Sequence, residues 1–366
     1  MNAATVDSTT MYYREGASDK VYQASIEPSG ELFVVNFAFG RRGSTLNTGT
    51  KTTSPVDYAT AKTIYDKLVR GKTGKGYTPG EDGTPYHQTD NEQRSTGLLP
   101  QLLNPIDENA VRLLVHDTEH CMQEKFDGKR VLLRKNNGAI TGTNRRGLTI
   151  GLPSSIITSA QQLSGDFIID GECVGEVLYV FDLLESGGED LRQSSYKRRL
   201  AALTNLLNRL TGGQAQYVQL VPTAYKPKDK ARMLDQLRQA NREGVVFKRL
   251  TAPYSAGRPN TGGPQLKHKF YATLSAVVAK VNPQRSVELR LLGKDGWQTA
   301  GNVTVPSNHA IPIVGTVVEI RYLYAFRESG CLYQPTYLGM RKDVEHHECI
   351  AAQLKFKAQS GRGGTA

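Results

Sequence analysis

The chain has 366 residues and a formal net charge of +11, with 46 lysines and arginines against 35 acidic residues. This length suits two or three domains with separate cores. The hydrophobic fraction of 38% excludes an intrinsically disordered chain, and no apolar run is long enough for a membrane helix. Because the basic surplus is spread along the whole chain, it indicates a polyanionic partner, and nucleic acid is the first candidate.

The cysteines indicate a reducing compartment. The four of them, at positions 121, 173, 331 and 349, show no CxxC spacing. Cysteines scattered in this way argue against a zinc site and against a disulfide framework. The first residues also lack the apolar core of a signal peptide. We therefore expect an intracellular protein, in the cytoplasm or nucleoid if the host is a bacterium.

Residues 1–10 are small and polar and are expected to form a flexible tail. Residues 11–77 are rich in segments that alternate with period two, which predicts strands. A helix is predicted over 55–68, with Ser54 as its N-cap and Pro55 in its first turn. The apolar positions of this helix share one face; they are Ala61, Ile64, Tyr65 and Leu68.

Three stretches in residues 11–77 that combine glycine with arginine or lysine resemble those of a known family. They are Phe39-Gly40-Arg41-Arg42-Gly43, Gly49-Thr50-Lys51 and Lys72-Thr73-Gly74-Lys75-Gly76-Tyr77. They resemble the WGR domain, a small sheet-plus-helix module, although Phe39 stands where that family has tryptophan and is expected to fill the same core position. The resemblance implies a DNA-binding module. Its phosphate contacts would come from Arg41, Arg42, Lys51, Lys72 and Lys75.

Residues 78–97 are rich in glycine, proline and threonine and are predicted to be a linker. Beyond them the run EKFDGKR, at 124–130, precedes a strand-like stretch. Lys125 and Asp127 are two apart, so on an extended segment they would face one pocket. Gly128 would let the backbone approach a ligand, and Arg130 would add a cation. A lysine among such groups is how an amine nucleophile is prepared.

Further motifs follow in chain order. Arg145 lies in an arginine-bearing turn, and two strands at 167–185, joined by a tight turn, carry Glu172 and Phe181. A carboxylate there can bind ribose or a metal, and a phenyl ring can stack on a base. Glu243 precedes a buried strand. Lys267 and Lys269 share one side of a short strand, an arrangement that favours a bound phosphate.

In order and spacing these elements resemble the collinear motifs of ATP-dependent DNA ligases, within the covalent nucleotidyltransferase superfamily. The resemblance covers residue 98 to the C-terminus. It implies an α+β multidomain protein: a WGR-like module at 11–77, a nucleotidyltransferase (adenylation) domain of antiparallel sheets and helices at 98–270, and an OB-fold β-barrel at 271–356. Residues 357–366 are expected to be a flexible tail. Short alternating strands beyond residue 271 agree with a barrel.

The resemblance also implies site roles. Lys125 would be the nucleophile that takes AMP from ATP, Phe181 would stack on adenine, and the segment Gln123-Glu124 would specify the base. The remaining nucleotide contacts would come from Arg130, Arg145, Glu172, Lys248, Lys267, Lys269 and Arg341. Asp127, Glu243 and Glu172 would serve Mg²⁺, with Mn²⁺ as a substitute. In the last motif Arg341 and Asp343 match, but Gly339 and Val344 depart from the family pattern.

The implied function is the sealing of 5′-phosphate/3′-hydroxyl breaks in DNA, in repair, replication or recombination, by a monomer that binds nicked or broken DNA through its basic surface. Three alternatives stay open. An RNA ligase shares the core chemistry, and an mRNA-capping guanylyltransferase uses the same type of lysine. The non-enzyme alternative is a DNA-end-binding protein with a degenerate core, against which the intact charged motif residues argue.

Overall fold

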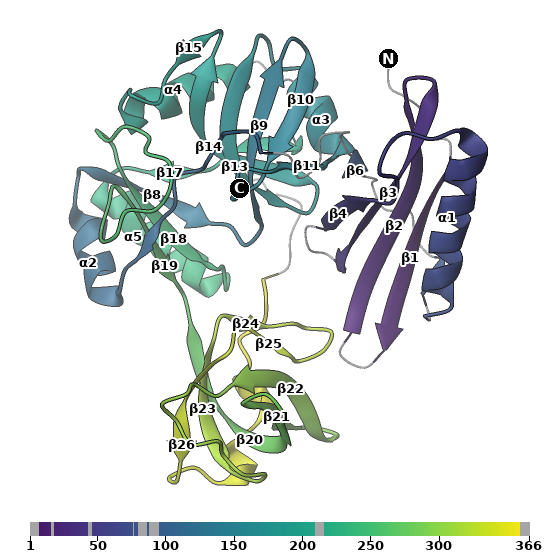
Figure 1. Ribbon diagram of the computed structural model, residues 1–366. Helices are drawn as coiled ribbons and strands as arrows, with labels where there is room; N and C mark the ends of the chain where they lie inside the picture. Colours follow the sequence, from purple (N-terminus) through teal and green to yellow (C-terminus); the bar gives the residue numbers. More distant parts are fainter. Residues whose placement is uncertain are drawn as a thin grey trace. The chain divides into compact units, whose positions relative to one another are not determined.

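A computed structural model describes residues 7–15, 18–42, 46–75, 77–79, 86–87, 95–208 and 216–358. The chain divides into two compact units, the first formed by Met1–Lys230 and Val246–Lys267 and the second by Ala231–Val245 and His268–Ala366. Both are rich in antiparallel sheet, as predicted (Figure 1). None of the helices in the described ranges has the length and apolar character needed to cross a membrane.

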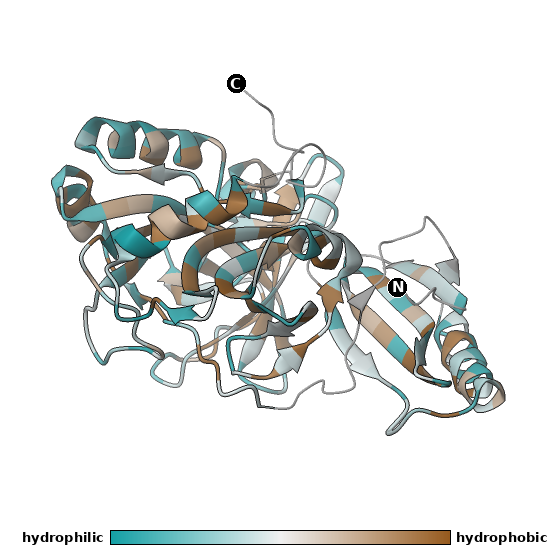
Figure 2. Cartoon of the chain, turned by 90° about the horizontal axis from the view of Figure 1, so that it is seen from above, coloured by the Kyte–Doolittle hydropathy of each residue, from teal (hydrophilic) through white to brown (hydrophobic). Residues whose placement is uncertain are grey.

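The N-terminal module of the first unit is an antiparallel sheet of order β4-β3-β2-β1-β5 with one helix, α1 (Tyr58–Thr73), on it (Figure 1). Apolar residues alternate with polar ones along its strands, seen as brown and pale segments in Figure 2. The inward set packs on Ala61 and Tyr65 of α1. The strands are β1 (Asp7–Glu15), β2 (Ser18–Ser29), β3 (Leu32–Arg41), β4 (Asn47–Thr50) and β5 (Thr78–Pro79).

The helix begins later than the sequence predicts. Its N-cap is Asp57, whose carboxylate accepts hydrogen bonds from the Thr60 backbone nitrogen at 2.9 Å and from the Thr60 hydroxyl at 2.6 Å. An aspartate that satisfies the first-turn N–H groups competes successfully with the earlier serine. The prediction of Ser54 as the cap is therefore wrong. The predicted apolar face is confirmed, since all of its members pack in the module core.

The larger sheet of the first unit has the order β11-β10-β9-β13-β14-β15, and β16 pairs with β14. The predicted hairpin is confirmed as β13 (Phe167–Val174) and β14 (Val177–Ser186), which meet at Gly175 with a φ of 59°. Helices α3 (Ser154–Gln161) and α4 (Tyr196–Leu207) contribute to the core on one face of the sheet. The other strands are β9 (Lys129–Asn136), β10 (Ala139–Thr143), β11 (Thr149–Ile150), β15 (Glu189–Asp190) and β16 (Val218–Leu220).

A second sheet, beside the larger one in sequence, has the order β17-β8-β18-β19-β7. Lys230 on α5 (Pro227–Gln239) is buried, and its Nζ donates hydrogen bonds to the carbonyls of Leu114, Asp117 and His120, at the end of α2 (Glu108–His116). The strands are β7 (Asn104–Pro105), β8 (His120–Lys125), β17 (Thr223–Ala224), β18 (Gly244–Arg249) and β19 (Gln265–Lys269). Two short strands, β6 (Tyr86–His87) and β12 (Leu152–Pro153), pair with each other.

In the second unit five strands pair in the order β22-β21-β20-β23-β26, close to the predicted segments. Because β22 and β26 are the edges of this order, the described strands form an open sheet, and the OB-fold barrel stays a prediction. The strands are β20 (Ala272–Asn282), β21 (Ser286–Gly293), β22 (Gly296–Thr304), β23 (Val317–Tyr322) and β26 (Thr336–Arg341). A short hairpin adds β24 (Tyr324–Ala325) and β25 (Leu332–Tyr333).

Candidate active site and nucleic-acid interface

Lys125 is the last residue of β8 and is half-buried. Its Nζ lies 3.5 Å from the Phe126 carbonyl oxygen, the outer limit of a hydrogen bond. The strand ends at Lys125 and β9 begins at Lys129, so Asp127 lies in a three-residue loop. Strand alternation therefore does not extend to Asp127, and a shared pocket for Lys125 and Asp127 stays a prediction.

Gly128 has a packing role. A Cβ on it would lie 2.2 Å from the Cys173 carbonyl oxygen and 2.8 Å from Cγ2 of Val174, both in β13. Any larger residue would push the loop away from the hairpin. The sequence assigned the glycine to close approach of a ligand, whereas the structure shows close approach of another strand.

Arg130 is anchored inside the protein. Its Nε donates to Oδ1 of Asp170 at 2.6 Å and its Nη2 donates to Oδ2 at 2.8 Å, a two-point contact with a fully buried carboxylate. Nη2 also donates to the Gln101 carbonyl at 3.1 Å. A charge-assisted pair of this geometry holds the guanidinium in one orientation.

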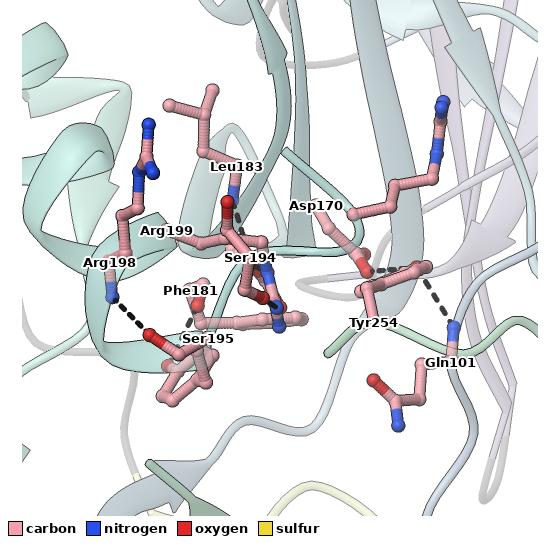
Figure 3. Close-up of polar contacts among 12 residues, drawn as sticks. Gln101, Asp170, Phe181, Leu183, Ser194, Ser195, Arg198, Arg199 and Tyr254 are labelled. Carbon is pink, nitrogen blue, oxygen red and sulfur yellow. Dashed lines mark hydrogen bonds and ion pairs between the residues drawn. The ribbon is translucent and has the colours of Figure 1, made fainter. Parts of the chain in front are cut away.

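Tyr254 shares the same carboxylate. Its hydroxyl donates to Oδ2 of Asp170 at 2.9 Å and accepts a hydrogen bond from the Gln101 backbone nitrogen at 2.9 Å (Figure 3). Burial and the neighbouring Asp170 charge both raise the pKa of Tyr254, so it stays a neutral donor. Asp170 thereby links three segments that are far apart in the sequence.

Phe181 stands at an irregularity in β14. The pairing with β13 passes from Gly171 opposite Val180 to Asp170 opposite Asp182, which leaves Phe181 as an extra residue. Such a bulge re-aims a side chain and is common beside active sites. The Lys248 Nζ lies 4.0 Å from the ring centroid and the Arg130 guanidinium lies 4.5 Å from it. The ring is therefore held by two cations and remains half-buried.

Lys248 is buried with an exposed fraction of 3%. Burial lowers the pKa of Lys248 to about 8, although Asp182 acts in the opposite direction. Its Nζ lies 3.4 Å from the Tyr196 hydroxyl, which donates to the Phe181 carbonyl at 2.8 Å. Gln123 Nε2 also donates to the Tyr196 hydroxyl, at 2.9 Å.

Gln123 therefore uses its side chain within the protein. Besides Tyr196, its Nε2 donates to Thr223 Oγ1 at 2.8 Å, and the side chain is buried. Between Gln123 and Glu124, only Glu124 is partly exposed. The geometry favours Glu124 or the backbone as the base-specifying group of this segment.

A second buried ion pair joins α4 to β14. Arg199 donates through Nε to Oδ1 of Asp182 at 2.7 Å and through Nη2 to Oδ2 at 3.0 Å, and both side chains are almost completely buried. Tyr196 and Arg199 of α4 were not among the site residues predicted from the sequence. The available signal was the polar run YKRR at the start of an otherwise leucine-rich helix.

The remaining predicted site residues of the first unit lie on three different segments of the chain. Glu172 is half-buried on β13, opposite Arg130 of β9 and opposite Tyr179 of β14. Arg145 is exposed in a turn whose Asn144 side chain accepts hydrogen bonds from the Arg146 and Leu148 backbone nitrogens. Lys267 is half-buried on β19.

In the second unit Glu243 and Lys269 form an ion pair, with Oε1 and Nζ 3.0 Å apart. Burial lowers the pKa of Lys269, but the Glu243 carboxylate outweighs it and raises the pKa overall. Arg341 forms a two-point pair with Asp343, at 2.8 and 2.6 Å, and lies 3.7 Å from Glu319. The predicted metal and phosphate residues Glu243 and Lys269 are thus brought together, as partners of each other.

The predicted metal site depends on which carboxylates the structure offers as ligands. Within the described ranges, no three His, Cys, Asp or Glu side chains lie close enough to enclose a metal ion. Mg²⁺ is usually held by one or two carboxylates together with substrate phosphates and water. Asp127 and Glu172 are half-buried carboxylates of the type that this mode uses. Glu243, in the second unit, forms an ion pair with Lys269.

The N-terminal module presents a basic and aromatic surface. The Lys72 Nζ lies 4.0 Å from the ring centroid of Tyr22, and the Lys51 Nζ lies 5.0 Å from that of Phe37. Burial lowers the pKa of Lys72, and the charges of Lys75, Lys51 and Lys20 lower it further, so these lysines are close together. We call Lys20, Lys51, Lys72 and Lys75 the lysine cluster.

Phe39 departs from its predicted role. Its side chain is 42% exposed, so it does not fill a core position. It stacks on Phe37, with ring centroids 6.1 Å apart, and on Tyr22, at 6.3 Å. Arg42 lies 4.7 Å from the Tyr12 ring, whose side chain packs with Val21, away from the core under α1.

Comparison with known proteins identifies two domains. Residues 8–84 match the family model of the WGR domain, and residues 173–269 match that of the ATP dependent DNA ligase domain. A "Probable DNA ligase" of Dictyoglomus turgidum is 27% identical over 192 residues, covering 43% of this chain and 32% of that protein. One of Mycolicibacterium paratuberculosis is 33% identical over 159 residues, covering 42% and 26%. The chain thus spans about a third or less of these relatives.

Solved structures share the fold. The structure named "Pmar-Lig_Pre." has a TM-score of 0.52 and 16% identity, and the match covers 78% of this chain and 72% of that one. "Pmar-Lig_PreS3" has a TM-score of 0.50 and 15% identity, with coverage of 77% and 72%. The resemblances read from the sequence motifs are confirmed. The chain carries a WGR domain in residues 8–84 and, in residues 173–269, a domain of the ATP-dependent DNA ligase family.

Proposed function

We propose that this protein is an ATP-dependent DNA ligase that seals 5′-phosphate/3′-hydroxyl breaks through an AMP adduct on Lys125. One observation carries the proposal. The matched ligase domain begins at Cys173, and the loop that follows Lys125 packs against that residue. This contact supports assigning Lys125 to the ligase domain, although the lysine lies outside the matched residues.

Three transfers make up the reaction. The neutral Lys125 amine attacks the α-phosphorus of ATP, so that a P–N bond forms, the P–O bond to pyrophosphate breaks and the amine loses a proton. The AMP then passes from the lysine to a 5′-phosphate of DNA. Finally the 3′-hydroxyl attacks that activated phosphate, a phosphodiester forms and AMP leaves.

Other residues bind and orient the nucleotide in this proposal. Phe181, held by Lys248 and Arg130, stacks on adenine, while Glu124 contacts the base and Glu172 the ribose. Arg145 and Lys267 contact the phosphates. Mg²⁺ bound with Asp127, Glu172 and the phosphates would neutralise the leaving group.

The second unit contributes two roles. Lys269 contacts the α-phosphate once released from Glu243, which then serves the metal. Arg341 orients the pyrophosphate from the C-terminal domain, for which we propose the OB-fold. Arg130 acts through Phe181 and Asp170, in place of the direct nucleotide contact that the family resemblance implied.

DNA is the proposed substrate because of the N-terminal module. A WGR domain with a lysine cluster over an aromatic stack whose outer ring, Phe39, is exposed fits a nucleic acid, in which phosphates and flat bases alternate. An intracellular monomer is part of the same proposal.

The test is the intact mass of the protein after incubation with Mg²⁺ and either ATP or GTP, followed by a chase with nicked duplex DNA. We expect an AMP adduct from ATP only, located at Lys125 by peptide mapping and discharged as the nick is sealed. Lys125→Arg is the matched control, since it keeps a positive side chain that cannot become a neutral nucleophile.

Each alternative predicts a different result. A GMP adduct would move the protein to the capping guanylyltransferases. Discharge on nicked RNA but not on nicked DNA would make it an RNA ligase. No adduct, even after pyrophosphate treatment to strip pre-bound AMP, would leave the DNA-end-binding protein.

A further inference from the structure

The loop between Lys125 and β9 is held by one hairpin. Phe126 stacks on Tyr179 of β14, with ring centroids 4.0 Å apart and planes inclined by 14°. On the other side of the loop, Gly128 packs against the backbone of β13 so closely that a Cβ would clash. Both strands of the hairpin therefore brace the short segment that directly follows the proposed nucleophile.

Tyr179 stands where this brace meets the proposed nucleotide site. It lies two residues before Phe181 on β14, and both side chains are half-buried while Leu178 and Val180 are buried in the core. Across the sheet it is opposite Glu172. One strand thus carries the proposed adenine platform and the support of the lysine loop.

We propose that Tyr179 is a positioning residue for Lys125. By stacking on Phe126 it fixes the backbone that carries the amine, relative to the base held on Phe181 and the ribose held by Glu172. This inference rests on the proposed function, because it assigns Tyr179 to the step in which the Lys125 Nζ bonds to the α-phosphorus and pyrophosphate leaves.

The positioning role predicts an effect confined to one step. Misplacement of a nucleophile by about 1 Å can cost roughly 100-fold in rate. In Tyr179→Ala we expect the single-turnover rate of Lys125 adenylation to fall about 10- to 100-fold at saturating ATP. The half-saturating ATP concentration should change by less than about threefold, since the groups that bind the nucleotide remain in place. Sealing of a nick that already carries AMP should also change by less than about threefold, because that step does not use the amine as nucleophile.

Three variants separate stacking from general damage. Tyr179→Phe keeps the ring and should restore adenylation to within about twofold. Phe126→Ala should resemble Tyr179→Ala, and the double variant should be no slower than either single one, because both remove the same stacked pair. Tyr179→Leu keeps apolar bulk without a flat ring, and it reports on stacking if the alanine variant does not fold.

A measurement without ATP keeps the inference distinct from the proposed function. Hydrogen–deuterium exchange of the amides at 126–128 should quicken at least about tenfold in Tyr179→Ala and stay at the wild-type rate in Tyr179→Phe. Unchanged exchange overturns the inference, and so does an equal fall in adenylation and in sealing of the pre-adenylated nick. A wild-type protein that forms no adduct overturns the proposed function alone, because the exchange comparison still decides whether Tyr179 holds the loop.

Discussion

Lys248 keeps an ionisable amine in a buried position between Phe181 and Tyr196. Its pKa is about 8 in the folded chain, against 10.5 in a solvated lysine, because burial penalises the charged form. Between these two values the unfolded chain binds more protons than the folded chain. The free energy of unfolding therefore rises as pH increases from about 8 to 10.5, and this contribution is lost again as pH falls through 8.

The first prediction is that Lys248→Met removes this pH dependence. From pH 8 to 10.5 the free energy of unfolding of the wild type should rise relative to that of the variant, by on the order of a few kcal/mol. Urea denaturation at several pH values, followed by tyrosine near-ultraviolet circular dichroism, measures the difference. The exposed Lys228→Met is the control, and parallel curves for wild type and Lys248→Met would contradict the prediction.

The second prediction concerns the loop glycine. Gly128→Ala introduces a Cβ only 2.2 Å from a backbone oxygen, so the loop must move and with it Lys125. We expect the rate of AMP-adduct formation to fall by about 10-fold or more. Gly71→Ala on α1 is the matched control, since a Cβ there meets nothing within 4 Å. An adduct rate in Gly128→Ala equal to that of the control would show that the close approach of the loop to β13 has no kinetic role.

At the scale of single elements, the cap of α1 gives the third prediction. Asp57→Ala removes the acceptor for two Thr60 donors, so the first turn should fray. Exchange of the Thr60 and Ala61 amides should then become several-fold faster. Ser54→Ala, at the cap position that the sequence suggested, should leave exchange of both amides as in wild type. Faster exchange in Ser54→Ala but not in Asp57→Ala would show that the helix begins at the earlier position.

The tie between α4 and β14 gives the fourth prediction. Asp182→Ala leaves the Arg199 charge buried without its carboxylate, which should cost about 3–5 kcal/mol of unfolding free energy. The double variant Asp182→Leu, Arg199→Met removes both charges and should recover most of that stability. Chemical denaturation followed by circular dichroism measures the loss, and fluorescence of the single tryptophan, Trp297, reports on the second unit separately. Equal destabilisation in the single and double variants would argue against a buried pair.

On the scale of the whole molecule, a net charge of +11 predicts DNA binding that weakens with salt. The fifth prediction concerns a triple variant in which glutamine replaces Lys20, Lys51 and Lys72. Its affinity for DNA should fall less steeply with salt, so that the slope of log affinity against log salt concentration is smaller in magnitude. The decrease should be about 0.9 for each DNA phosphate that the variant no longer neutralises, measured on a nicked duplex. Lys67→Gln, an exposed lysine of α1 outside the lysine cluster, is the control. A slope equal to that of wild type would place the DNA elsewhere on the chain.

Local patterns were enough for much of the fold. Two apolar runs joined by a tight turn predicted the β13–β14 hairpin, in which β13 is buried along most of its length. Alternating apolar residues predicted the strands from β20 to β23. The start of α1 was misplaced, since several residues there can cap a helix and only the hydrogen bonds to Thr60 select Asp57. The core position expected for Phe39 failed for a related reason: a period-two pattern gives the face of a strand but not how far α1 extends over it.

By itself the sequence determined the two domain families and the basic character, and it predicted the lysine, carboxylates and phenylalanine that the proposed chemistry uses. Residue type and spacing along the chain carry that information directly. Only the tertiary structure decided that Arg130 is committed to Asp170, that Glu243 holds Lys269, and that Tyr179 braces the loop after Lys125. These pairs are 40, 26 and 53 residues apart. Partners at such distances are set by how sheets and loops pack, which no local pattern encodes.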